Sequence, residues 1–337
     1  MRPIGGYFEW EFPPVKKQLL HEIAVYLNSG RHALEYILKG LGNIHCLWIP
    51  YFTCDAVMLP IQRLGVSWKF YHIDEKLEIA GNLELGENEF LLYTNYYGIK
   101  DEYSKQLANQ YGEKLILDNA QALYCKPVSG SHQFYSPRKF MGMPDGGIAV
   151  TSVPDTASEL PVDKSFDRCK HLLKRIELSP SEGYDDFKDV SKAIAEVPLS
   201  QMSNLSKSIF ASVDLDDIKL KRRENFECIH RALKATNRLQ IPSMDFFECP
   251  LVYPYWADNG SAIKKQLIEQ QVFVATYWPN VFEWCKLTDL ECELADHVVC
   301  IPIDQRYGIE DMKYMCEKIE ELLDVDWQMP LSSVRGS

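Results

Sequence analysis

The chain has 337 residues, of which 46% are hydrophobic and 25% are charged, a composition typical of a globular protein with two domains. The formal net charge is −12, which argues against a nucleic-acid-binding protein, because such a protein would be basic. No run of about 18 apolar residues occurs, so we expect no membrane span and no membrane partner.

The ten cysteines are scattered along the chain, and none forms a Cys-x-x-Cys pair. This spacing does not favour a zinc site, so we expect no bound metal. The first residues, Met-Arg-Pro-Ile-Gly-Gly-Tyr, lack the apolar core of a signal peptide. We therefore expect reduced thiols and a cytoplasmic location.

The first part of the chain alternates short apolar runs with helical patterns. Strands are predicted at residues 45–49, 66–71, 90–94, 114–117 and 147–151, and a helix is predicted at 101–111. This alternation predicts an α/β fold with a mainly parallel sheet and helices on both faces. Ligands of such sheets bind beyond the carboxyl ends of the strands.

The second part begins with a polar, irregular stretch at 152–190, in which 179–183 is expected to be the most flexible segment. A helical pattern follows at 185–233. Strands are then predicted at 251–253 and 298–302, and helices at 261–270 and 309–323. We therefore expect a large domain at 1–235 with an N-terminal arm, a smaller α/β domain at 236–328, and a disordered tail at 329–337.

Two residues point to a specific cofactor chemistry. Asp118 ends the apolar run at 114–117, and Lys139 lies 21 residues later in a glycine-bearing loop at 134–147, which leads into the strand at 147–151. Pyridoxal phosphate (PLP) enzymes need a lysine that forms a Schiff base and a carboxylate that keeps the pyridine nitrogen protonated. Taken alone, Asp118 is equally well interpreted as a helix cap, and Lys139 as a solvated loop residue.

A phosphate site is suggested by Ser29-Gly30 at the start of a helical pattern, because exposed N–H groups and the helix dipole favour an anion there. Ser136, three residues before Lys139, is a second phosphate candidate. Gln121, three residues after Asp118, would share its side and reach the phenolic oxygen of the cofactor. An ordinary capped helix is the simpler interpretation of Ser29-Gly30 by itself.

Taken in order, these segments resemble the DegT/DnrJ/EryC1/StrS aminotransferases, which aminate keto-sugar nucleotides. Residues 28–34, Asn-Ser-Gly-Arg-His-Ala-Leu, are similar to the family's Ser-Gly-Thr-x-Ala-Leu. Residues 49–53 resemble its Val-Pro-x-x-Thr, 95–98 its His-x-Tyr-Gly, and 117–122 its Glu-Asp-Ala-Ala-Gln-Ala. Lys139 keeps the family's spacing to the Glu-Gly-Gly motif, here Asp145-Gly-Gly.

The resemblance implies fold type I, with a seven-stranded sheet between helices, and a PLP-dependent aminotransferase that forms a homodimer. It assigns the Schiff base to Lys139, the ring-nitrogen contact to Asp118 and the oxygen contact to Gln121. The phosphate cup is assigned to Gly30, Arg31 and His32, with Ser136. The expected donor is an amino acid, with glutamate first, and the expected acceptor is a keto-sugar nucleotide used for polysaccharide or glycan synthesis.

The chain also departs from the family pattern. Phe134 and Ser136 stand where the family has Ser and His before the lysine, and Arg31 replaces the cup threonine. Cys54 stands where an aromatic side chain usually stacks on the ring, so the stacking group is expected elsewhere, with Phe52, Tyr51 and Tyr96 as candidates. Tyr96, Trp278 and Arg306 are candidate substrate contacts. Another PLP reaction, such as elimination or decarboxylation, and a degenerate ligand-binding member are the alternatives.

Overall fold

The computed structural model describes residues 10–13, 21 and 23–323. The expected tail at 329–337 and most of the expected N-terminal arm lie outside these residues. No helix within the described ranges is long and apolar enough to cross a membrane.

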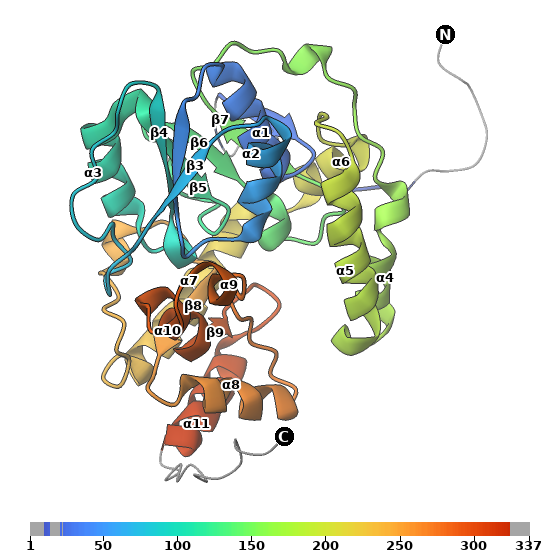
Figure 1. Ribbon diagram of the computed structural model, residues 1–337. Helices are drawn as coiled ribbons and strands as arrows, with labels where there is room; N and C mark the ends of the chain where they lie inside the picture. The colour runs from blue at the N-terminus through green and yellow to red at the C-terminus, as the bar shows by residue number, and fades with distance from the viewer. Residues whose placement is uncertain (1–9, 14–20, 22, 324–337) are drawn as a thin grey trace, which may run out of the picture.

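A seven-stranded sheet lies at the centre of the N-terminal part, with strand order β3-β2-β4-β5-β6-β7-β1 (Figure 1). The neighbours from β3 to β6 are parallel, whereas β7 runs antiparallel to both β6 and β1. The strands are β1 (Val25–Leu27), β2 (Cys46–Pro50), β3 (Trp68–Tyr71), β4 (Glu89–Thr94), β5 (Leu115–Asn119), β6 (His132–Tyr135) and β7 (Gly147–Val150). The predicted mainly parallel seven-stranded sheet is therefore confirmed.

Alternation along the strands buries both faces of this sheet. In β5, Leu115 and Leu117 belong to one apolar core, and Ile116 between them belongs to another. The core of Ile116 is covered by α1 (Gly30–Leu41) and α2 (Met58–Arg63). The opposite core includes residues of α3 (Asp101–Tyr111) and α7 (Leu215–Leu233), so helices sandwich the sheet.

Two local predictions were wrong. Phe134 was expected in a loop, but it lies in β6, a strand whose first residues, His132 and Gln133, are polar and yet buried. The stretch at 179–183 was expected to be flexible, but Ser179 and Glu182 form a capping box at the start of α5 (Pro180–Glu196). Together with α4 (Lys170–Glu177), α5 forms a helical hairpin, and α6 (Asn204–Ser212) follows it.

The C-terminal part carries a two-stranded antiparallel sheet of β8 (Val252–Trp256) and β9 (Val298–Pro302). Its helices are α8 (Gly260–Glu269), α9 (Val281–Trp284), α10 (Leu290–His297) and α11 (Ile309–Leu323). This small unit lies below the sheet, and the α4–α5 hairpin extends beside it (Figure 1). One apolar core joins Tyr135 of β6, Phe226 of α7 and Tyr253 of β8, so no break in packing marks residue 235, and that domain boundary stays a prediction.

Candidate functional site

Asp118 lies at the carboxyl end of β5 and is only 5% exposed. Its Oδ1 accepts the backbone N–H of Ala120 at 2.9 Å. Burial raises the pKa of Asp118, and the nearby ammonium group of Lys139 opposes this shift. The carboxylate is therefore held in a poorly solvated place where a positively charged partner would stabilise it.

The turn before α1 forms a cup of backbone N–H groups. Ser29 caps the helix, and its Oγ accepts the backbone N–H of His32 at 3.2 Å. The helix starts with Gly30 and Arg31 and has no acidic residue in its first turn. Its N-terminus is therefore suited to an anion.

The start of β7 holds this cup in place. Gly146 N–H donates to the Asn28 carbonyl at 2.8 Å, and a Cβ at Gly147 would lie 2.1 Å from the Ser29 carbonyl. Only glycine allows this close approach of two backbones. The Gly-Gly pair after Asp145 thus has a structural reason.

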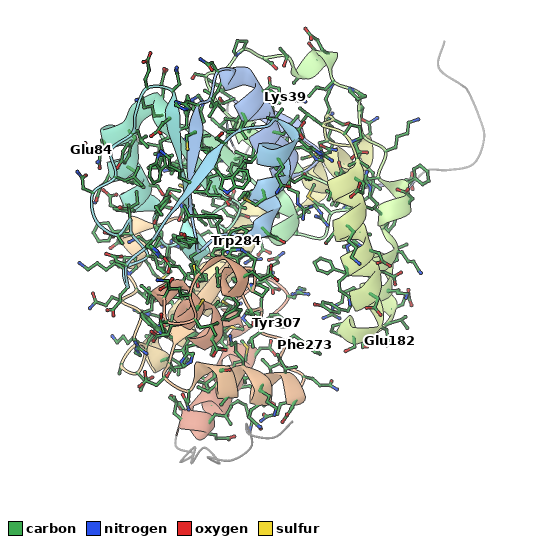
Figure 2. All side chains as sticks on the ribbon, viewed as in Figure 1. Lys39, Glu84, Glu182, Phe273, Trp284 and Tyr307 are labelled. Atoms are coloured by element: carbon green, nitrogen blue, oxygen red, sulfur yellow. The ribbon has the colours of Figure 1, made fainter. Side chains whose placement is uncertain are left out.

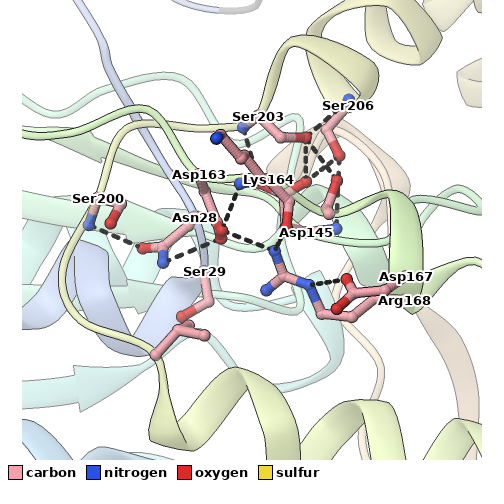
Figure 3. A network of polar contacts seen from close by, with 12 residues as sticks. Asn28, Ser29, Asp145, Asp163, Lys164, Asp167, Arg168, Ser200, Ser203 and Ser206 are labelled. Atoms are coloured by element: carbon pink, nitrogen blue, oxygen red, sulfur yellow. Dashed lines mark hydrogen bonds and ion pairs between the residues drawn. The ribbon is translucent and has the colours of Figure 1, made fainter.

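A polar network surrounds the outer side of the cup (Figure 3). Asn28 donates to Asp163 at 3.3 Å, and Asp163 pairs with Arg168 at 2.7 Å. The buried carboxylate of Asp145 accepts the Ser203 N–H at 2.8 Å and the hydroxyl groups of Ser203 and Ser206. These bonds attach the cup to the segments at 163–168 and 200–206.

A cavity of about 320 Å³ lies between the cup and Asp118. Several predicted site residues line it, namely Gly30, Arg31, Asp118, Ser136 and Lys139. The structure therefore brings together an acid, a lysine and an anion cup that together span more than 100 residues of the sequence. Pockets for small cofactors have volumes of about 300 Å³ and above.

Lys139 ends a single 3-10 turn, η4 (Pro137–Lys139), and its side chain is exposed. Two larger clefts also include Arg138 and Lys139 and lie between the α4–α5 hairpin and the C-terminal small unit. Phe273 and Tyr307 belong to the small unit on one side of this region, and Glu182 lies on the hairpin (Figure 2). A substrate of some size therefore has access to Lys139.

Two arginines at the cavity bind only neutral oxygens. Arg31 donates to the Ser191 carbonyl at 3.3 Å, and Arg138 donates to the Met143 carbonyl at 3.3 Å. Burial lowers the pKa of Arg138 to about 10, and the charge of Arg31 adds to this shift. Within the described part of the chain neither guanidinium makes an ion pair, so an anion between them would relieve their repulsion.

His32 does not line the cavity but lies under the cup. Its Nε2 donates to the Val197 carbonyl at 3.0 Å, so Nδ1 is free to accept the Ser29 hydroxyl at 2.8 Å. Burial lowers the pKa of His32 to about 4, so the ring is neutral at pH 7. Its predicted cofactor contact is not tested, and the geometry supports a role through Ser29.

Gln121 is also buried outside the cavity lining. Its Oε1 accepts the Tyr97 N–H at 2.7 Å, and its Nε2 has no hydrogen-bond partner among the described residues. One amide donor is thus left for a ligand. The contact of Gln121 with a cofactor stays a prediction.

The aromatic candidates form a packed cluster. Phe52 is fully buried, with its ring 5.6 Å from that of Tyr96 and 4.8 Å from that of Trp278. None of the three lines the cavity, whereas Cys54 does. The predicted roles of Phe52 in ring stacking and of Tyr96 and Trp278 in substrate binding are not tested, and in this structure their rings pack on each other.

Arg306 lies in one of the clefts that lead to Lys139. Its guanidinium forms a bidentate pair with Asp304, with distances of 2.7 and 2.8 Å. Its predicted substrate contact is not tested.

Sequence reasoning missed several residues of the cavity wall, among them Phe187 and Ser191 of α5. Their spacing of four places them on one face of the helix, but nothing in the sequence ties that face to the end of β5. Ala120 and Phe134 belong to the apolar wall, together with Leu34, Ala56 and Val57. No group of three or more metal-binding side chains is found in the ranges that the structure describes.

Comparison with solved structures identifies the architecture. NtdA from Bacillus subtilis, solved with bound cofactor PMP, superimposes with a TM-score of 0.62 at 14% identity, covering 90% of this chain and 73% of NtdA. A DegT DnrJ EryC1 StrS aminotransferase from Brucella abortus gives 0.61 at 16% identity, covering 90% and 87%. The chain has the fold type I architecture of these aminotransferases.

The sugar aminotransferase CalS13 from Micromonospora echinospora shares this fold type I architecture, with a TM-score of 0.61 at 17% identity over 88% of this chain and 87% of CalS13. No family profile and no curated protein sequence matches the chain. The likeness to fold type I proteins is therefore one of structure.

Proposed function

We propose that this protein is a PLP-dependent aminotransferase of the DegT/DnrJ/EryC1/StrS type, which moves an amino group from a donor amino acid to a carbonyl acceptor. One observation carries the proposal: a single cavity is lined by Asp118, Lys139 and the N-terminus of α1. The NtdA structure with bound PMP supports the choice of cofactor.

The residues present fit PLP at three points. The buried Asp118 carboxylate forms no ion pair among the described residues and would take the protonated ring nitrogen. Ser29, Gly30 and Arg31 at the start of α1, with Ser136, would hold the phosphate. Ala120 and Cys54 are small side chains of the cavity lining, which leave room for a ring.

When bound, PLP supplies an electron sink that makes the α-proton of the donor acidic. The chain supplies the acid–base groups around it. The Lys139 amine would hold the cofactor covalently, and Lys139 Nζ, once the donor has displaced it, would carry the proton that leaves the donor α-carbon. Asp118 would keep the ring nitrogen protonated.

The acceptor is proposed to be a keto-sugar nucleotide, and the donor glutamate. The likeness to CalS13 supports a sugar substrate. Charge supports an anionic one, because a cleft beside Lys139 gathers five basic residues and a single acidic one in a chain of net charge −12. The basic residues are Arg138, Lys139, Arg175, Arg222 and Arg306, and the acidic residue is Asp304. A homodimer in the cytoplasm, with a role in polysaccharide or glycan synthesis, completes the proposal.

The test is the donor half-reaction. PLP-loaded protein mixed with glutamate should convert the cofactor to pyridoxamine phosphate and release one equivalent of 2-oxoglutarate per site, and a nucleotide-linked keto sugar should then regenerate PLP. Release of carbon dioxide or ammonia without pyridoxamine phosphate would instead indicate a decarboxylase or a lyase. PLP binding without turnover of any amino acid would indicate a ligand-binding protein.

A further inference from the structure

The backbone carbonyl of Phe140, directly after Lys139, is held by side chains from distant elements. The η4 turn closes on itself, because Lys139 N–H donates to Ser136 O at 3.2 Å and Phe140 N–H donates to Pro137 O at 2.9 Å. The Phe140 carbonyl instead accepts Gln305 Nε2 at 2.8 Å and, more weakly, Arg222 Nη2 at 3.5 Å. The backbone around Lys139 is therefore fixed from outside the turn.

Arg222 orients this contact from α7. It is 2% exposed, donates through Nη1 to the Leu251 carbonyl at 3.0 Å, and lies over the Phe140 ring at 4.7 Å. Its Nε donates to Gln305 Oε1 at 3.1 Å. Because a guanidinium only donates, the Gln305 oxygen must face Arg222 and the amide NH₂ must face the Phe140 carbonyl.

We propose that Gln305, oriented by Arg222, is a positioning residue for Lys139. The inference rests on the proposed function, in which the Lys139 amine must reach two carbon atoms in turn. A displacement of about 1 Å at such a group lowers a rate about a hundredfold. By fixing the Phe140 carbonyl, Gln305 limits how far the Lys139 Cα moves.

This contact also links substrate binding to the lysine. Gln305 and Arg306 follow each other in the segment after β9, and both line the basic cleft that includes Lys139. A substrate anion bound at Arg306 therefore acts on the same short segment that holds the Phe140 carbonyl. Positioning of Lys139 and occupation of the cleft are coupled through two adjacent residues.

Two substitutions separate positioning from stability. Gln305→Glu keeps an oxygen for Arg222 and gains a charge-assisted bond to it, but it loses the donor to the Phe140 carbonyl and places a carboxylate oxygen against it. Gln305→Met loses both bonds. Gln266→Met, on the half-buried Gln266 of α8, is the matched control outside this contact.

The holoenzymes are compared by donor half-reaction kinetics, by the pH midpoint of the visible band of lysine-bound PLP, and by thermal unfolding. We expect the Glu variant to unfold no earlier than the wild type, yet to react about tenfold or more slowly, with a shifted pH midpoint and little change in KM for glutamate. The Met variant should react as slowly as the Glu variant and should also be less stable than the wild type. The Gln266→Met control should match the wild type in both measurements.

A Glu variant with the wild-type rate and pH midpoint would overturn the inference. It would also be overturned if each variant lost rate only in proportion to its loss of stability. These results leave PLP binding and transamination by the wild type intact. A wild type that takes up no PLP would overturn the proposed function itself.

Discussion

Replacing Asp118 by asparagine separates the chemistry of the site from the stability of the fold. Asparagine has nearly the same shape and keeps an oxygen for the Ala120 N–H, which lies 2.9 Å from Asp118. It loses the negative charge that would face the protonated ring nitrogen of PLP. The variant therefore changes one electrostatic interaction and little packing.

The size of the effect follows from burial. Two unit charges about 4 Å apart attract by about 4 kcal/mol at an effective dielectric constant of about 20. Asp118 is 5% exposed, so solvent screens little of this energy. If asparagine recovers up to half of the attraction through its oxygen, the donor half-reaction should slow by roughly 30- to 1000-fold.

Although Asp118→Asn should slow the reaction, it should not destabilise the cofactor-free protein. Folding raises the pKa of Asp118 because burial disfavours its charged form, so the folded state binds this proton more tightly than the unfolded chain. The buried charge therefore lowers the free energy of unfolding. This loss is absent below the pKa of Asp118 in the unfolded chain, near 3.8, and is fully present above its raised pKa in the folded protein. At neutral pH the cofactor-free asparagine variant should be at least as stable as the wild type.

Rapid-mixing absorbance with glutamate measures the half-reaction, and thermal unfolding of both cofactor-free proteins measures stability. Asp118 is not the ring-nitrogen acid if the variant reacts at the wild-type rate. The reasoning also fails if the loss of rate comes with an equally large loss of stability in the cofactor-free form.

Three further predictions concern the cup. Arg31→Ala should weaken PLP binding tenfold to about a hundredfold in a fluorescence titration, because a charge-assisted bond contributes about 1.5–3 kcal/mol, and unchanged affinity would contradict a phosphate contact. Gly147→Ala places a methyl group 2.1 Å from the Ser29 carbonyl, so this variant should have a lower melting temperature and take up less PLP. In the control Gly142→Ala the nearest atom lies 3.5 Å from the new methyl group, so that variant should melt like the wild type. Equal melting temperatures of the two variants would refute the close approach. Burial lowers the pKa of His32 from 6.5 to about 4, so stability that is present above pH 6.5 is lost as the pH falls towards 4. Between these pH values the free energy of unfolding of the wild type, measured in urea, should fall by about 3 kcal/mol more than that of His32→Gln. Parallel pH profiles of the two proteins would contradict this.

Most of the sheet could be predicted from the sequence because its strands are apolar and are followed by residues typical of turns. β5 was found from its apolar run, and its end placed Asp118 correctly at the carboxyl edge. β6 was missed because His132 and Gln133 look like loop residues. Both are buried because other polar groups satisfy them: His132 lies 2.6 Å from the Thr151 hydroxyl, and Gln133 donates to the Val128 carbonyl at 2.9 Å.

The α4–α5 hairpin shows a different limit of prediction from sequence. Ser-Pro-Ser-Glu at 179–182 has the composition of a turn, but the same residues are a helix start when an amphipathic stretch follows. α5 then brings Phe187 and Ser191 to the cavity. Such a contact depends on tertiary packing, which no local pattern in the sequence describes.

For the site, spacing to Asp145-Gly-Gly was the signal that singled out Lys139, and the structure gives that spacing a physical basis in the Gly147–Ser29 contact. The aromatic residues carried no comparable signal. Phe52 and Tyr96 follow strand ends, as ligand-binding residues do, but their rings pack on each other in this structure. A position near the edge of the sheet does not by itself decide between a ligand contact and core packing.

The central claim is that Lys139 carries PLP. The most direct measurement is to incubate the purified protein with PLP, reduce it with borohydride to fix any lysine-bound cofactor, and locate the label by peptide mass spectrometry, with Lys139→Ala in parallel. We expect a visible absorbance band before reduction and a single label on the peptide containing Lys139, both absent from the variant. A wild type without label, or a label on another lysine that persists in Lys139→Ala, would contradict the account.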